Sequence, residues 1–200
     1  MIKLFVVEDQ TLLRDAVSGL LELESDIEVL GKFPDGRAAL DSIEHLKPDL
    51  VLTDIEMPEL NGIELIEKIV THYPSIKTVI MTTFSRSGYI RRALNAGVGG
   101  FVLKESPSAY LVDAIRRVMV GQRVIESELA LHALDDNDPL ADKERKALRM
   151  AGEGLRAAEI SSALHLTEGT VRNYLSSAIT KLNAGNSVDA ARIAEQKGWL

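Results

Sequence analysis

Acidic side chains follow two apolar segments of the sequence, at the points where those segments end. The segment "LFVV" leads into Glu8 and Asp9, and the segment "LVLT" leads into Asp54. If both segments are neighbouring parallel strands, their carboxyl ends meet at one edge of a sheet and the three carboxylates converge. Converging carboxylates repel one another unless a cation neutralises them, and Mg²⁺ suits an open site made of oxygen ligands. The sequence therefore predicts a magnesium site at this edge.

Two more polar side chains stand at the ends of later apolar segments. Thr82 ends "KTVIMT", and Lys104 follows "GFVL". A metal, a carboxylate nucleophile, a hydroxyl donor and a fixed cation are what phosphoryl transfer onto a carboxylate requires, because negative charge spreads over the equatorial oxygens. Each residue alone also fits a turn, a strand or a solvated strand end. Their joint placement is what favours a phosphoryl site.

Short apolar segments alternate with amphipathic ones through residues 1–120, which predicts five strands and five helices. Right-handed crossovers turn this alternation into an α/β fold with a doubly wound, five-stranded parallel sheet and helices on both faces. Ligands of such sheets bind beyond the carboxyl ends of the strands. We expect the strands at 3–7, 27–33, 49–53, 77–82 and 100–104, and the helices at 12–23, 36–46, 62–73, 87–97 and 109–120.

A linker and a helical domain are expected after the fifth helix. Gly121 opens the predicted linker, 121–138, and a cluster of Asp, Asn and Pro near its end opposes regular structure. Beyond it, 139–200 predicts a small all-α domain in which two helices flank a short turn near Thr167, although any small helical bundle shows the same periodicity. Its helices are expected at 142–154, 156–166, 168–182 and 187–198.

Composition narrows the classes of protein. The 200 residues are 46% hydrophobic, ample for packed cores, and contain no cysteine, which excludes disulfides and thiolate metal sites. No segment is long and apolar enough to insert into a membrane, so we expect a cytoplasmic protein. The net charge of −7 is uneven, with −9 before Pro139 and +2 from Pro139 onward. This asymmetry permits DNA binding by the second part.

Residues 1–120 resemble a response-regulator receiver domain, which has a flavodoxin-like fold, through "VVEDQ", "VLTDIEMPELNG", "VIMTT" and "GFVLK". The sequence departs from many receivers at Glu105, where proline commonly follows the lysine. The resemblance implies a sensor histidine kinase as partner and a role for each of seven residues. Asp54 would accept the phosphoryl group; Glu8, Asp9, Asp54 and the backbone carbonyl of Glu56 would hold Mg²⁺; Thr82 and Lys104 would bind phosphoryl oxygens; and Phe101 would be an aromatic switch.

Residues 139–200 resemble the helix-turn-helix DNA-binding domain of NarL/FixJ and LuxR-type regulators, through "PLADKERKALRMAGEGLRAAEISSALHLTEGTVRNYLSSAITKL". The resemblance implies that the helix at 168–182 enters the major groove of promoter DNA. Lys143, Tyr174 and Ser187 depart from residues common in that family. By this likeness Arg172, Asn173 and Ser176 would face the groove, and Thr167 and Thr170 would lie near phosphates.

The preferred hypothesis is a transcription regulator that phosphorylation at Asp54 causes to dimerise and bind promoter DNA. A metal-dependent phosphatase with an aspartyl intermediate is an alternative, but Glu56 stands where such enzymes use a general-acid Asp. Binding of DNA without phosphorylation is another. Two surfaces could form the homodimer, and the favoured one joins the first and fifth helices. It would use Leu12, Leu13, Val17, Leu111 and Ile115, whereas the other, around the fourth helix, would use Arg91, Arg92 and Arg116.

Overall fold

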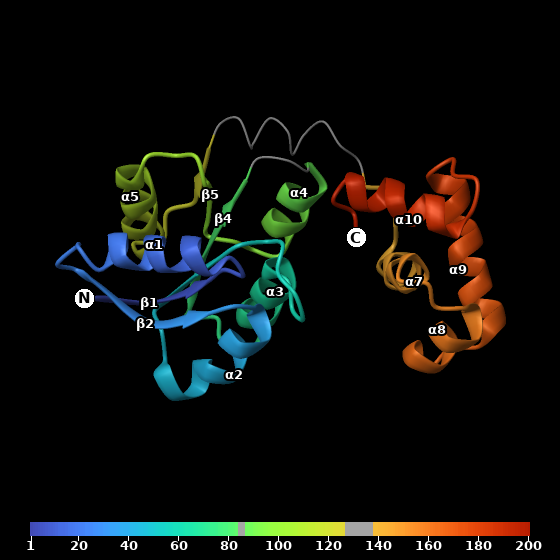
Figure 1. The fold of residues 1–200 in the computed structure, drawn as a ribbon, viewed down its shortest axis with the longest axis horizontal. Coiled ribbons are helices and arrows are strands. Elements are labelled where there is room, and N and C mark those ends of the chain that lie inside the picture. Colours follow the sequence, from blue (N-terminus) through green and yellow to red (C-terminus); the bar gives the residue numbers. More distant parts are fainter. Residues whose placement is uncertain (84–86, 127–137) are drawn as a thin grey trace. The chain divides into compact units, whose positions relative to one another are not determined.

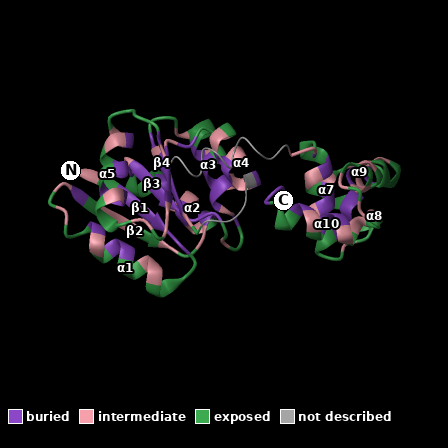
Figure 2. Ribbon diagram, turned by 90° about the horizontal axis from the view of Figure 1, so that it is seen from above, coloured by how far each residue is buried: buried purple, intermediate pink, exposed green. Residues whose placement is uncertain are grey.

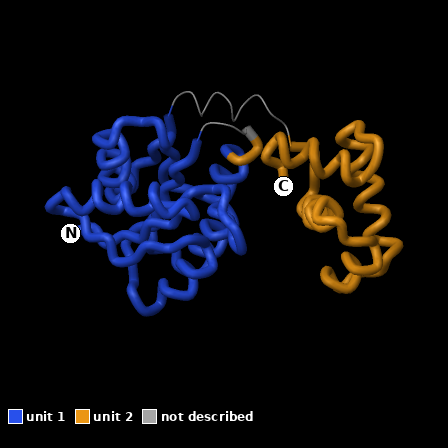
Figure 3. Tube along the Cα trace, viewed as in Figure 1, with its two compact units in different colours: residues 1–85, 90–132 blue, residues 86–89, 133–200 orange. Residues whose placement is uncertain are grey.

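The computed structural model of the protein describes residues 1–83, 87–126 and 138–200. The chain forms two compact units (Figure 3). The first comprises Met1–Ser85 and Ile90–His132, and the second comprises Arg86–Tyr89 and Ala133–Leu200. Most of the predicted linker, 127–137, lies outside the described residues.

A parallel sheet forms the centre of the first unit (Figure 1). Its strand order is β2-β1-β3-β4-β5-β6, so the predicted doubly wound sheet is confirmed. The prediction of five strands is wrong, because Val124 and Ile125 pair in parallel with Gly100 and Phe101 and add a sixth. These two residues had been assigned to the linker. The strands are β1 Ile2–Val7, β2 Ile27–Phe33, β3 Leu50–Thr53, β4 Lys77–Thr82, β5 Gly100–Leu103 and β6 Val124–Ile125.

Helices cover both faces of this sheet (Figure 1). Leu4 and Val6 of β1 belong to one buried cluster, whereas Phe5 and Val7 belong to another, because successive side chains of a strand point to opposite faces. The first cluster includes residues of α1 Thr11–Leu21 and α5 Ser108–Met119, and the second includes residues of α2 Gly36–Leu46 and α3 Gly62–His72. The inner strands β1, β3, β4 and β5 accordingly have buried residues on both faces, whereas most residues of the edge strand β2 are half-buried or exposed (Figure 2). A further helix, α4 Ser87–Asn95, precedes β5.

Residues 138–200 of the second unit form four helices around a core rich in small residues. Ala178, Ala190 and Ala194 pack there with Leu148 and Trp199. Alanine at these positions lets the helices approach one another closely. The helices are α7 Asp142–Gly152, α8 Ala157–Leu164, α9 Glu168–Lys181 and α10 Ser187–Gln196.

None of the helices in the described ranges combines the length and the apolar character needed to cross a membrane.

Candidate functional site

The predicted acidic residues converge at the carboxyl edge of the sheet. β3 ends at Thr53, which pairs with Val7 of β1, and the Asp54 amide donates to the Val7 carbonyl at 2.9 Å. This ladder places the residue after β1 beside the residue after β3. Glu8, Asp9 and Asp54 each offer a carboxylate oxygen, and these oxygens lie within 4.8 Å of one another.

Lys104 joins this acidic cluster from the end of β5. Its amide donates to the Thr82 carbonyl at 2.8 Å, which fixes the backbone beside β4. Its Nζ donates to Asp54 Oδ2 at 3.0 Å and lies 2.8 Å from Glu8 Oε2. All three side chains are buried, with 9% of the Lys104 side chain exposed. One ammonium among three carboxylates leaves the site with an excess of negative charge.

Burial and this excess charge shift the titration of the cluster. Burial raises the pKa of Glu8, and the Asp54 charge adds to the effect, although the close Lys104 ammonium opposes both. Burial likewise raises the pKa of Asp54 more than the Lys104 hydrogen bond lowers it. Burial by itself would lower the pKa of Lys104, but contacts with Glu8 and Asp54 outweigh it and raise that pKa. The two acids therefore lack part of the positive charge that would stabilise their ionised forms.

The donor set fits a hard divalent cation. Glu8 Oε2 is buried and accepts no hydrogen bond of ordinary geometry, although Lys104 Nζ is close to it. Asp9 is exposed, so the cluster opens toward solvent and water ligands can reach it. Carboxylate oxygens with access to water are the ligands that Mg²⁺ prefers. The cluster of Glu8, Asp9 and Asp54 is therefore suited to Mg²⁺.

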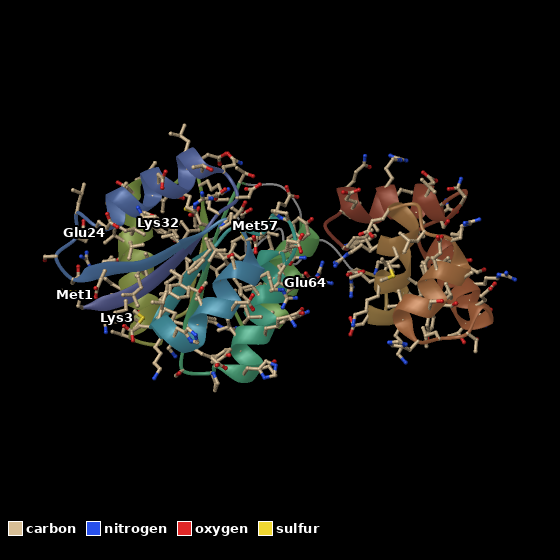
Figure 4. All side chains as sticks on the ribbon, turned by 60° about the horizontal axis from the view of Figure 1, so that its bottom comes forward. Met1, Lys3, Glu24, Lys32, Met57 and Glu64 are labelled. Atoms are coloured by element: carbon tan, nitrogen blue, oxygen red, sulfur yellow. The ribbon has the colours of Figure 1, made fainter. Side chains whose placement is uncertain are left out.

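A tight loop after Asp54 shapes the pocket. The Ile55 amide donates to Asp54 Oδ1 at 2.7 Å, and the Gly62 amide donates to the Ile55 carbonyl at 3.0 Å. A Cβ on Gly62 would lie 1.8 Å from the Asp54 carbonyl oxygen, so only glycine fits this position. Glu56 is an exposed residue of the same loop, and Met57 follows it (Figure 4).

Thr82 and Phe101 lie on the strands nearest Lys104. Thr82 is the last residue of β4 and is half-buried, and its hydroxyl donates to the Thr83 carbonyl at 3.2 Å. Phe101 is fully buried in β5, between Ile80 of β4 and Ile125 of β6. The structure thus brings Glu8, Asp9, Asp54 and Lys104 into one cluster, while the Thr82 hydroxyl bonds to the backbone beside it.

Arg14 is a residue of this site that the sequence analysis missed. Its Nη1 donates to the Glu8 carbonyl at 2.6 Å and to the Asp9 carbonyl at 3.4 Å, and its Nη2 donates to Thr11 Oγ1 at 3.3 Å. The guanidinium therefore holds the backbone that carries two of the acids. An arginine one turn into the helix after an acidic pair is the signal that could have identified it.

The predicted DNA-binding residues lie on α9 and at its start. Thr167 is the N-cap, and its Oγ1 accepts a hydrogen bond from the Thr170 amide at 3.2 Å. Arg172, Asn173 and Ser176 are all exposed, as a surface that contacts a ligand must be. Arg172 Nη2 lies 2.7 Å from Glu168 Oε2 with 70% of its side chain exposed, so this ion pair is weak and can be exchanged for another partner.

A buried carboxylate ties α9 to the start of α7. Glu144 accepts hydrogen bonds from Ser177 Oγ at 2.6 Å, Lys181 Nζ at 2.7 Å and the Ala141 amide at 2.8 Å. Burial by itself would raise the pKa of Glu144, but these hydrogen bonds outweigh it and lower that pKa. Glu144 therefore fixes the orientation of the helix that carries Arg172. Nothing local in the sequence indicates that this acid is buried.

Comparisons with known proteins agree with both halves of the structure. Residues 4–116 match the response regulator receiver domain family, and residues 138–194 match the luxR family of bacterial regulatory proteins. Over 200 residues and 100% of both chains, the protein is 44% identical to the uncharacterized transcriptional regulatory protein YvfU of Bacillus subtilis. It is 41% identical, over the same span, to the transcriptional regulatory protein DesR of Bacillus subtilis.

A solved structure shares the fold. RcsB from Salmonella enterica serovar Typhimurium, bound to promoter rprA in the presence of phosphomimetic BeF₃⁻, matches with a TM-score of 0.72 and 24% identity. The match covers 97% of this chain and 98% of that chain. Together with the two families matched along the sequence, these likenesses show that the chain is a two-component response regulator, a transcription regulator with a receiver domain followed by a LuxR-type helix-turn-helix domain.

Proposed function

We propose that phosphorylation of Asp54 by a sensor histidine kinase activates this transcription regulator and strengthens its binding to promoter DNA in the cytoplasm. The observation that carries the proposal is the buried Asp54 carboxylate, which Lys104 contacts beside Glu8 and Asp9. Membership in a family of transcription regulators supports this role over that of a phosphatase acting on separate substrates.

The proposed transfer is an in-line displacement. An Asp54 carboxylate oxygen attacks the phosphorus of a phosphohistidine; a P–O bond forms, the P–N bond breaks, and the imidazole nitrogen keeps the electron pair. Lys104, which pairs with Asp54 beforehand, then binds an oxygen of the new phosphoryl group. The Thr82 hydroxyl turns from the Thr83 carbonyl to donate to another phosphoryl oxygen, and Phe101 responds as the aromatic switch.

Mg²⁺ is the proposed cofactor of this step. Glu8, Asp9, Asp54 and the backbone carbonyl of Glu56 would hold it. When bound, the cation would neutralise negative charge on the phosphoryl oxygens. Arg14 supports this role by fixing the carbonyls of Glu8 and Asp9, which limits how far those acids can separate.

We also propose that phosphorylation promotes a homodimer. A two-fold dimer presents two recognition helices to half-sites about one DNA turn apart, which strengthens binding through effective concentration. The surface of α1 and α5 is less apolar than its sequence suggests, because Val17, Leu111 and Ile115 are buried while 85% of Leu12 is exposed. Arg116, a candidate of the other surface, already forms ion pairs within its own chain. Its Nη2 lies 2.7 Å from Glu24 Oε2 and 2.6 Å from Asp26 Oδ1 (Glu24 is labelled in Figure 4). On the surface of α1 and α5, the candidates that remain are Leu12 and the half-buried Leu13.

Selection of genomic DNA fragments, with and without acetyl phosphate and Mg²⁺, tests the function as a whole. We expect the phosphorylated protein to enrich a small set of promoter fragments and to bind them more tightly than the untreated protein does. Equal enrichment and equal affinity under both conditions would show that DNA binding is independent of phosphorylation. Absence of any enriched fragment would contradict the role in transcription.

Arg172→Ala tests the DNA-binding surface. If Arg172 forms a bidentate pair with a guanine, its loss should remove about 1–3 kcal/mol of discrimination between the selected site and a site with that base pair changed. If it contacts a phosphate, binding should weaken equally for both sites and the salt dependence should become shallower. Fluorescence anisotropy with both DNA sites at several salt concentrations separates these results.

Arg192→Ala is a matched control, because Arg192 is also an exposed arginine of the LuxR-type domain that pairs with an acid on its own helix. Its partner is Asp189, and it lies on α10 rather than α9. It should change binding much less than Arg172→Ala. An Arg172→Ala protein with unchanged affinity and unchanged specificity would contradict the proposed recognition helix.

A further inference from the structure

Glu126, the residue that follows the unexpected strand β6, is bonded to the loop that carries Lys104. Its Oε1 accepts hydrogen bonds from Ser106 Oγ at 2.6 Å and from the Leu103 amide at 3.2 Å. These donors stand on either side of Lys104 in the sequence. One carboxylate thus spans the part of the chain from which the Lys104 side chain reaches Asp54 and Glu8.

The position of Glu126 explains this contact. The β5 and β6 ladder ends where Phe101 pairs with Ile125, so the Leu103 amide has no backbone partner on β6. The next amide, that of Lys104, points the opposite way and donates to Thr82 of β4. The Glu126 side chain therefore extends the ladder on the outer side of β5 while β4 holds the inner side. The end of β5 is fixed from both sides only when Glu126 is present.

The strand β6 would hold this edge weakly by itself. It has two residues, and its backbone bonds include the one from the Val124 amide to the Gly99 carbonyl at 3.0 Å. A hydrogen bond to an ionised acceptor is stronger than one between neutral groups, so the Glu126 carboxylate contributes much of the attachment. Without Glu126, the segment from Leu103 to Ser106 would keep the bond from the Lys104 amide to Thr82 of β4 but would lose its attachment on the outer side of β5.

We propose that Glu126 is a positioning residue for phosphoryl binding, which holds the loop from Leu103 to Ser106 so that Lys104 points at the phosphoryl group on Asp54. Glu126 touches neither the phosphoryl group nor the metal. It acts through Lys104, and the proposal rests on the proposed role of Asp54 as phosphoacceptor. The residue belongs to the segment after α5, so the phosphoryl site of this protein depends on a strand beyond the five predicted.

Binding of beryllofluoride to the full-length protein with Mg²⁺, followed by ¹⁹F NMR, tests the proposal. Glu126→Ala should raise the dissociation constant about tenfold, because a charged hydrogen-bond acceptor is lost from a loop that must be ordered for Lys104 to act. Glu126→Gln keeps an oxygen that can accept both hydrogen bonds, so it should stay within about threefold of wild type. Ser106→Ala removes one of the two donors, so its dissociation constant should lie between those of Glu126→Gln and Glu126→Ala.

Glu105→Ala is the matched control, since it removes a negative charge next to Lys104 but leaves the hydrogen bonds of Glu126 in place. It should leave the dissociation constant within about twofold of wild type, because exposed charges are screened by solvent. Mg²⁺ affinity, measured by calorimetry without beryllofluoride, should be unchanged in Glu126→Ala, since the acids at the ends of β1 and β3 keep their own bonds.

Three results would overturn the proposal. The first is a Glu126→Ala protein that binds beryllofluoride as tightly as wild type, and the second is an equal loss of beryllofluoride affinity in Glu126→Ala and Glu105→Ala. The third is a Glu126→Ala protein that loses as much Mg²⁺ affinity as beryllofluoride affinity. The first excludes a role for Glu126, the second indicates a general effect of charge, and the third indicates damage to the whole site. Failure of the wild-type protein itself to bind beryllofluoride would instead contradict Asp54 as phosphoacceptor.

Discussion

Replacing Asp54 by alanine is expected to abolish the incorporation of phosphate from acetyl phosphate in the presence of Mg²⁺. The wild-type protein should reach about one phosphate per chain, because we propose Asp54 as the one phosphoacceptor. Asp54→Asn should also fail, since the amide keeps the shape of the side chain but is not a nucleophile of comparable strength. Phosphate incorporation measured by intact mass checks this expectation, and hydroxylamine should release the label because the product is an acyl phosphate.

Asp41→Asn provides the control for the loss of one negative charge. Asp41 is an exposed residue of α2 and does not belong to the acidic cluster, so its replacement should leave labelling unchanged. Labelling of Asp54→Ala at the wild-type level would show that another residue is the phosphoacceptor. The phosphoryl-dependent gain in DNA affinity should disappear together with the label.

Of the replacements proposed here, Gly62→Ala should lower the stability of the receiver domain the most. The added Cβ would lie 1.8 Å from the Asp54 carbonyl oxygen and 2.8 Å from the Asp54 carbonyl carbon. These are backbone atoms beside a buried strand, so the loop must shift rather than a flexible side chain. We expect the free energy of unfolding to fall by about 3 kcal/mol and phosphorylation to be impaired, because Asp54 itself is displaced.

Urea unfolding followed by circular dichroism measures this change. Trp199 is the single tryptophan and packs in the LuxR-type domain, so its fluorescence follows that domain separately and should be little altered. Gly19→Ala is the matched control, since an added Cβ there meets nothing within 4 Å on α1. It should stabilise the protein by up to about 1 kcal/mol, because alanine favours the helix. A Gly62→Ala protein as stable as wild type would mean that this close approach is absent in solution.

The sequence by itself was enough to predict the convergence of Glu8, Asp9, Asp54 and Lys104. Each follows an apolar strand, and parallel strands separated by helices must bring their carboxyl ends to one edge. The exposure of Arg172, Asn173 and Ser176 agrees with the groove-facing positions that the likeness to LuxR-type domains implied. These features depend on the order and period of residues, which the sequence states directly.

Only the tertiary structure decided which residues support that site. Glu126 accepts a hydrogen bond from Ser106, 20 residues away in the sequence, and Glu144 accepts one from Lys181, 37 residues away. Nothing local in the sequence marks either pair. The burial of Val17, Leu111 and Ile115 and the pairing of β6 were likewise missed, because helical and strand periods show that a face is apolar without showing what covers it. Such contacts depend on which segments pack together. Packing brings together residues that are far apart in the sequence at no regular spacing, so a local pattern cannot identify them.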